Sequence, residues 1–454
     1  MPMLRLLLSV LAAFLFVASP ARAQSDTVAA DDPGLLVLAP DRGFLGNEKT
    51  RDVMADFREH TSNVGLAFAT YEETTSNLNE GLSQIDTENG VVVLPLFLSA
   101  HHTLYRSAQQ AMPTVENGVQ WASPLGTSYL AEEILFDRVE ALSEQPDEEA
   151  LVVVGYGATD AAGADSIQAD LQASAERAAE KYGLAGSGQV VVQYARNASE
   201  KASRAAIGRA TKTVKAAAGE HERVIVVPYN LGMEYTSMMS SWSWMSRPLG
   251  SIDEVVANGK AVLPHRNVER WLRRTATTYR PLSPDDVGVI AVPHGSEYNW
   301  NETMRTGLDP LTDDYTIAEA FSMVDPVVVE RAVRQLEKEG FTAAVMVRIF
   351  SMESSFQEKS HYILGLRDTF GRSIMGESVP ERIRTHLQMT TLGGLEADPH
   401  FAKGLLDRAQ AISENPSDET VILLAHGTGS DEENAHWMEN LRTIADTMRA
   451  HGGD

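Results

Sequence analysis

The chain repeats one sequence pattern, and this repeat constrains the fold more than any other feature. Four short, largely β-branched apolar runs each open into a loop, at residues 35–38, 151–154, 287–292 and 421–424. They start about 116, 136 and 134 residues apart. Such runs are typical of buried strands in parallel sheets, and the spacing suits a small α/β domain rather than a solenoid repeat. We therefore predict that each run is the first strand of one unit.

A second apolar run recurs inside the first three units, and amphipathic segments separate the runs. The second runs cover residues 91–98, 224–227 and 343–349. Helical periodicity is present in residues 47–60, 166–182, 199–218 and 327–339. Strands that alternate with helices form right-handed crossovers and parallel sheets. The sequence therefore predicts an α/β fold of repeated units, each a small parallel sheet flanked by helices.

Composition limits the chemistry that these units can carry. The 454 residues include no cysteine, which excludes disulfides, iron–sulfur clusters and thiolate metal sites and leaves His, Asp and Glu as strong metal ligands. The formal net charge of -25 repels nucleic acid and anionic membranes and attracts cations. We therefore expect no nucleic-acid partner.

The first 23 residues have the features of a cleavable export signal. Arg5 supplies positive charge, residues 6–17 are apolar, and Ala21-Arg22-Ala23 fits a small-residue cleavage site. No later run reaches the roughly 20 apolar residues that a transmembrane span needs. We expect a secreted or periplasmic mature chain that begins at Gln24 and has no membrane span.

Polar residues follow the second runs at a shared distance. When the three runs are aligned, the equivalent residues just after them are His101, Glu234 and Glu353. Each lies past the carboxyl end of a predicted parallel strand, where open α/β sheets place their ligands. His102 would point to the opposite side in an extended segment, so we expect His101 rather than His102 to face a ligand.

Two kinds of motif mark the strand ends. The loops after the third and fourth first strands contain Pro293-His294-Gly295-Ser296 and Ala425-His426-Gly427-Thr428, and residues 95–102 read Pro-Leu-Phe-Leu-Ser-Ala-His-His. In kind and order these motifs resemble the class II tetrapyrrole metal chelatases, the family of sirohydrochlorin and cobalt chelatases. That family opens with a strand followed by His-Gly-Ser and has a Pro-x-Phe-Leu segment that leads into a metal-binding His.

The resemblance implies chelatase-like half-domains, two of which face each other across a cleft that holds the tetrapyrrole. It places them at residues 24–145, 146–280 and 281–416, after the signal peptide at 1–23, and places the incomplete start of a fourth unit at 417–454. Pro40 and Tyr156 stand where the first and second units should carry the loop histidine. Those two loops therefore lack that ligand.

The resemblance also implies a divalent metal, cobalt or iron first and nickel or zinc as alternatives, and a tetrapyrrole partner. We expect His294 and Glu353 to be catalytic, and the metal ligands to be His294, Glu353, His426 and His101. Imidazole, with a pKa of about 6.5, binds such metals and accepts pyrrole protons, and a carboxylate beside it accepts another. Further candidates are His361 as a ligand, residues 233–245 as a cover for the macrocycle, and four arginines for its carboxylates: Arg247, Arg348, Arg367 and Arg372.

Other catalytic motifs are absent from the sequence. It contains no dinucleotide-binding glycine fingerprint, phosphate-binding loop, Gly-x-Ser-x-Gly elbow or His-Glu-x-x-His pair. Asn47, Asn301 and Asn434 each follow a first-strand loop, and we predict that they are helix N-caps. We therefore predict an exported metal chelatase. A non-catalytic periplasmic metal- or haem-binding protein is the alternative, a scaffold with decayed sites is the third possibility, and the oligomeric state stays open.

Overall fold

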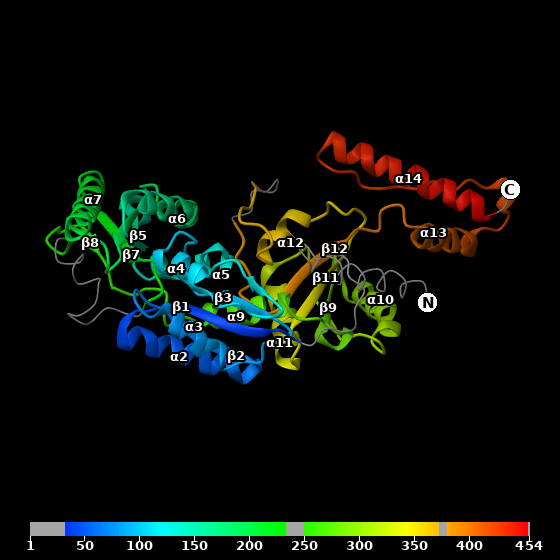
Figure 1. Ribbon diagram of the computed structural model, residues 1–454. Coiled ribbons are helices and arrows are strands. Elements are labelled where there is room, and N and C mark those ends of the chain that lie inside the picture. Colours follow the sequence, from blue (N-terminus) through cyan, green and yellow to red (C-terminus); the bar gives the residue numbers. More distant parts are fainter. Residues whose placement is uncertain (1–31, 233–248, 372–378, 453–454) are drawn as a thin grey trace. The chain divides into compact units, whose positions relative to one another are not determined.

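The computed structural model describes residues 32–232, 249–371 and 379–452 (Figure 1). By their internal contacts these residues divide into two bodies. The first body contains the residues up to Pro281 together with Arg384–Gln388. The second contains Leu282–Ile383 and the residues from Met389 onward. No helix in these ranges is both long and apolar enough to cross a membrane.

Several sequence-based predictions fall outside the described residues. They concern the export signal, the methionine-rich segment at residues 233–245 with Glu234, and the side chains of Arg247 and Arg372. These stay predictions.

Three four-stranded parallel sheets form the framework, with the strand orders β2-β1-β3-β4, β6-β5-β7-β8 and β10-β9-β11-β12. We call the three units the first, second and third half-domains. Their strands are β1 (Gly34–Pro40), β2 (Val64–Ala69), β3 (Val91–Pro95), β4 (Val119–Trp121), β5 (Glu149–Ala158), β6 (Gln189–Tyr194), β7 (Arg223–Pro228), β8 (Val255–Val256), β9 (Val287–Pro293), β10 (Ile317–Glu319), β11 (Ala343–Ile349) and β12 (Gln388–Gly393). The prediction of an α/β fold with repeated parallel sheets is confirmed.

Helices flank each sheet. The described α-helices are α2 (Gly43–His60), α3 (Thr74–Leu82), α4 (Thr103–Ala111), α5 (Tyr129–Glu140), α6 (Ala161–Tyr182), α7 (Glu200–Ala218), α9 (Arg266–Thr278), α10 (Tyr298–Leu308), α11 (Pro326–Glu339), α12 (Gln357–Ile363), α13 (Pro399–Ile412) and α14 (Asp431–Gly452). Short 3-10 turns lie at Leu125–Thr127, Pro146–Glu148, Pro284–Asp286, Asp309–Leu311 and Pro416–Asp418.

Local sequence signals account for these elements. Every residue of β1, β3 and β9 is buried, as expected for apolar strands covered on both faces. The side chain of Asp325 caps α11 by accepting from the backbone N–H of Val327, and Gly340 ends the helix with a φ of 92°. Side-chain caps also begin α6 and α7, at Asp160 and Ser199, whereas α2 begins without one. The four predicted helical segments overlap α2, α6, α7 and α11.

The first and second half-domains share one hydrophobic core. It joins Leu35 and Leu94 of the first sheet to Val153 and Ile225 of the second, with Trp271 of α9. Helix α5, which follows the last strand of the first half-domain, packs on α6, and α9 of the second half-domain packs on α2. The last helix of each half-domain therefore packs on the first helix of the other half-domain, and we call these two half-domains the first pair.

The second body holds the third half-domain and the helices α13 and α14, which pack around Ala402, Ile444 and Met448. The prediction of a strand at residues 421–424 is wrong, because Val421, Ile422 and Leu424 are 56%, 75% and 89% exposed and no described strand pairs with them. In each of the three half-domains, by contrast, the first strand (β1, β5 or β9) lies between two neighbouring strands. The predicted half-domain boundaries stay predictions.

Candidate functional site

The first and third strands of the third sheet end side by side. Strands β9 and β11 are parallel, and Pro293 pairs with Ile349. The rings of His294 and Phe350, the next residues on each strand, lie 6.3 Å apart between centroids. His294 and the loop that carries Glu353 therefore share one edge of the sheet, as predicted. We call this the third-sheet edge.

The loop after β9 holds the imidazole of His294 in one orientation. Its Nδ1 lies 2.8 Å from the carbonyl oxygen of Gly295, whose φ of 77° favours glycine. A carbonyl can only accept a hydrogen bond, so Nδ1 carries the proton and Nε2 keeps its lone pair. His294 is exposed. The Nε2 atom is therefore available to bind a metal ion or to take a proton.

His426 has the same local geometry. Its Nδ1 lies 2.7 Å from the carbonyl oxygen of Gly427, where φ is 75°. The ring meets Trp437 edge-on, with 4.7 Å between centroids. Two loops far apart in the sequence thus fix an exposed histidine in one tautomer, with Nε2 as the acceptor.

Asparagines clamp these loops, and their prediction as N-caps is wrong. Asn301 lies inside α10, where its amide accepts from the backbone N–H of Ser296 at 2.9 Å and donates to the same residue's carbonyl at 3.1 Å. Asn434, inside α14, does the same to Thr428 at 2.7 and 3.0 Å. Asn47 lies inside α2 and accepts from the N–H of Arg42 at 2.9 Å. The helices begin earlier than expected, so the amides reach back to the loops.

The Glu353 loop is fixed from inside the protein. Arg348 on β11 is 2% exposed and donates to the carbonyl oxygens of Glu353 and Ser355, both at 2.6 Å. Burial lowers the pKa of Arg348, and the nearby Glu353 opposes that shift. The carboxylate of Glu353 is exposed. Arg348 thus supports the loop, and the prediction that it binds tetrapyrrole carboxylates is wrong because its guanidinium is buried.

Two other predicted residues lie on and after α12. Burial, Arg348 and Arg367 lower the pKa of His361, which favours its neutral form. Arg367 forms an ion pair with Glu358 at 3.1 Å. Within the ranges that the structure describes, no three His, Asp or Glu side chains are gathered closely enough to hold a metal ion. The predicted ligands His294, Glu353 and His426 therefore remain separate candidates.

Sequence reasoning missed a carboxylate at the third-sheet edge. Glu396, in the loop after β12, accepts hydrogen bonds from the backbone N–H of Glu353 and from His436 and Asn440 on α14. Burial alone would raise the pKa of Glu396, but these donors hold it below its ordinary value. The available signals were the glycine pair at residues 393–394 and a His and an Asn four residues apart on one helix.

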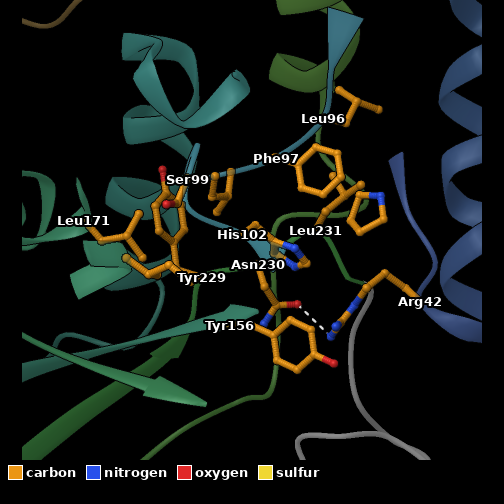
Figure 2. A pocket seen from close by; sticks show the side chains of 13 residues that line it. Arg42, Leu96, Phe97, Ser99, His102, Tyr156, Leu171, Tyr229, Asn230 and Leu231 are labelled. Carbon is orange, nitrogen blue, oxygen red and sulfur yellow. Dashed lines mark hydrogen bonds between the residues drawn. The ribbon is translucent and has the colours of Figure 1, made fainter. Parts of the chain in front are cut away.

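In the first body, His102 rather than His101 lines the cavity between the two half-domains (Figure 2). His102 is buried and caps α4 by accepting from the N–H of Leu104 at 3.1 Å, and burial and Arg42 lower its pKa to about 3. His101 is half-exposed beside Arg106, with Nε2 4.0 Å from an Asp170 oxygen. His102 thus turns inward at the helix cap, whereas His101 stays half-exposed beside Asp170; that His101 binds a ligand stays a prediction.

Side chains fill the space between the first two half-domains. The guanidinium of Arg42 lies 4.1 Å from the ring centre of Tyr156, and it donates to Asn230 at 3.1 Å (Figure 2). The remaining cavity is about 20 Å³, which is room for one water molecule. A Cβ on Gly157 would meet His102 at 2.2 Å. As far as the described residues show, the cavity that His102, Tyr156 and Arg42 line therefore has no space for a macrocycle.

A larger hollow of about 490 Å³ lies on the outside of the first half-domain, between α2 and α3 and along the edge strand β2. Side chains already bond the free backbone groups of that strand. Arg58 donates to the carbonyl of Val64, Asn77 donates to that of Phe68, and Gln84 accepts from the N–H of Leu66. The hollow contains none of the predicted ligands.

Comparison with known proteins gives only distant structural similarity. No family model and no curated protein matches the chain. The multi-domain protein DR2241 from Deinococcus radiodurans, described as structurally similar to chelatases, is 15% identical with a TM-score of 0.34, and the match spans 56% of each chain. This chain thus matches little more than half the length of that protein.

Two structures of SirB are also similar. SirB from Bacillus subtilis with Fe3+ is 15% identical with a TM-score of 0.38, over 54% of this chain and 96% of SirB. The sirohydrochlorin chelatase SirB from Bacillus subtilis subspecies spizizenii, in complex with cobalt, is 14% identical with a TM-score of 0.36, over 54% and 95%. At these values none of the three assigns a function to this chain.

Proposed function

We propose that this protein is a chelatase that inserts a divalent metal ion, cobalt or iron, into a sirohydrochlorin-like tetrapyrrole at the third-sheet edge. The observation that carries the proposal is the matched geometry of His294 and His426. Each imidazole is exposed and is held by its own loop with Nδ1 protonated and Nε2 free. Free Nε2 atoms can both hold the metal ion and accept protons.

The reaction needs two proton acceptors and a loosely held metal ion. Insertion breaks two pyrrole N–H bonds, forms bonds from the ring nitrogens to the metal, and releases two protons. In our proposal His294 and His426 deliver the ion, and the exposed carboxylate of Glu353 balances its charge and takes a proton. The described residues hold no ready cluster of three such ligands, so the proposal requires His426 to approach His294 and Glu353 when the ion binds. A site with fewer protein ligands than a closed structural site would leave coordination positions open for the ring nitrogens.

The first body differs from the third-sheet edge, and this difference supports our placing the metal site at that edge. Tyr156 occupies the loop position that His426 occupies in its own segment, and its ring lies 5.8 Å from that of His102 across the first pair. The cavity there has a volume of only about 20 Å³. We therefore assign the first body a structural role and place the chemistry at the third-sheet edge.

The test is a metallation assay with sirohydrochlorin and Co²⁺, Fe²⁺ or Ni²⁺, followed by visible absorption. We expect multiple turnovers by the native chain and their loss in His294→Ala and in His426→Ala. His451→Ala is the matched control, because His451 is exposed on α14 and its Nδ1 bonds the carbonyl of Thr447 on the same helix. Metal or haem retained in a one-to-one ratio without turnover would favour the binding-protein alternative instead.

Export is a further part of the proposal. It rests on the charged and apolar features of residues 1–23. Cell fractionation of a tagged full-length chain should find it, shortened, outside the cytoplasm, whereas full-length protein in the cytoplasm would rule export out.

A further inference from the structure

Glu396, in the loop after β12, contacts both the Glu353 loop and α14. One carboxylate oxygen accepts from the backbone N–H of Glu353, and the other accepts from Nε2 of His436 at 2.9 Å and from the amide of Asn440. The N–H of Glu396 itself donates to the carbonyl of Ser351 at 2.9 Å. One residue thus ties the Glu353 loop to α14, the helix that follows the His426 loop.

The backbone conformation at Glu396 and at Gly394 places the loop after β12 against the Glu353 loop. Glu396 has a φ of 45°, a conformation that side-chain-bearing residues rarely adopt and that persists only where the surroundings fix it. A Cβ on Gly394 would lie 2.3 Å from the N atom of Glu353. The loop after β12 therefore presses against the Glu353 loop, and only glycine fits at residue 394.

The first body makes the equivalent connection with different groups. Asp170 follows Tyr156 by 14 residues on α6, as Asn440 follows His426 by 14 residues on α14. Asp170 accepts from Ser99 at 2.5 Å, in the loop that also carries His101. The first helix of one half-domain thus meets the third-strand loop of the other. The loop after the third strand is thus held by a carboxylate in both bodies: by Asp170 in the first body and by Glu396 in the second.

His436 cannot use the same nitrogen for a metal ion. Its Nε2 faces a carboxylate oxygen and so carries a proton in this contact. The contact therefore positions α14 and does not extend the set of ligands. Because α14 also carries Asn434, the clamp of the His426 loop, its position governs that histidine.

We infer that Glu396 is a positioning residue, which holds the Glu353 loop against α14, the helix that follows the His426 loop, and so supports metal binding by the residues on both. The inference rests on the proposed function. Hydrogen-bond partners of ligand-bearing groups typically affect metal affinity by roughly 10- to 100-fold. Loss of the Glu396 carboxylate should weaken cobalt binding to that extent.

The experiment measures Co²⁺ binding by the full chain, from visible absorption and calorimetry, in Glu396→Ala and Glu396→Gln. Gln keeps the side-chain size and one acceptor oxygen, so its affinity should fall between those of the native protein and the Ala variant. Glu439→Ala is the control, since it removes the same charge from an exposed position on α14. Hydrogen exchange at the amide of Glu353 should rise in Glu396→Ala and stay unchanged in the control.

The outcomes separate the inference from the proposed function. Native affinity and an unaltered cobalt spectrum in Glu396→Ala, with cobalt binding lost in His294→Ala, would overturn the inference alone. Failure of the native chain to bind cobalt would overturn the proposed function and the role of Glu396 with it. A loss of affinity in both Glu396 variants, with control-like melting of Glu396→Gln, supports the inference.

Discussion

His102 makes the stability of the first body depend on pH. Burial and Arg42 lower its pKa to about 3, while an unfolded histidine has a pKa near 6.5. Between about pH 6.5 and pH 3, His102 is therefore protonated in the unfolded chain but neutral in the folded protein. The free energy of unfolding then falls by about 1.4 kcal/mol per pH unit until the folded pKa is reached. From pH 6.5 to 5.0 this amounts to about 2 kcal/mol.

His102→Asn isolates this effect. Asn is a good N-cap, so α4 keeps its cap while the titrating group is removed. The assay is urea unfolding at pH 7.5 and 5.0, followed through hydrogen exchange of the amides in β1 and β5. The native protein should lose about 2 kcal/mol more than His102→Asn between these values. His101→Asn should behave like the native protein, because His101 is half-exposed. An equal loss in all three proteins would refute the buried, neutral His102.

Three further predictions follow from the contacts. Arg384 donates to both oxygens of Asp137 and to the fully buried Glu133, so Arg384→Ala should destabilise the first body by about 3 kcal/mol in urea unfolding; an unchanged midpoint would contradict this. Asn434→Ala should weaken cobalt binding in calorimetry, whereas Asn47→Ala, the equivalent change in the first body, should not. Tyr156→His should add no second cobalt in equilibrium dialysis, because the cavity that residue 156 lines has a volume of only about 20 Å³ and Arg42 lies against the ring at that position.

The sequence was sufficient for the framework and for one edge of the site. Apolar strands buried on both faces and capped amphipathic helices are local features, so β1, β9, α6 and α11 could be predicted from their own residues. The shared edge of His294 and Glu353 followed from the parallel arrangement of their strands.

Packing between segments that are distant in the chain could not be predicted from the sequence. The choice between His101 and His102 depends on where α4 begins and on the space that Gly157 of the second half-domain leaves. The clamps made by Asn301 and Asn434 depend on helices that start several residues before them. Glu396 reaches Glu353 across 43 residues of sequence, and no periodicity indicates such a contact.

At residues 421–424 the sequence predicts a strand that the structure does not contain. Their composition matches that of a buried first strand, yet Val421, Ile422 and Leu424 are exposed. Apolar content alone does not make a strand, since a strand also needs neighbours for its backbone hydrogen bonds. The loop that follows nevertheless has the geometry of the His294 loop, because Gly427 and Asn434 make the contacts there that Gly295 and Asn301 make in the His294 loop.

X-ray absorption spectroscopy of the cobalt-loaded protein tests the central claim most directly, because imidazole rings give characteristic scattering beyond the first coordination sphere. Our account predicts two imidazoles and at least one oxygen ligand per cobalt, with one imidazole lost in His294→Ala and one in His426→Ala. A spectrum without imidazole, or one that neither substitution changes, would contradict it.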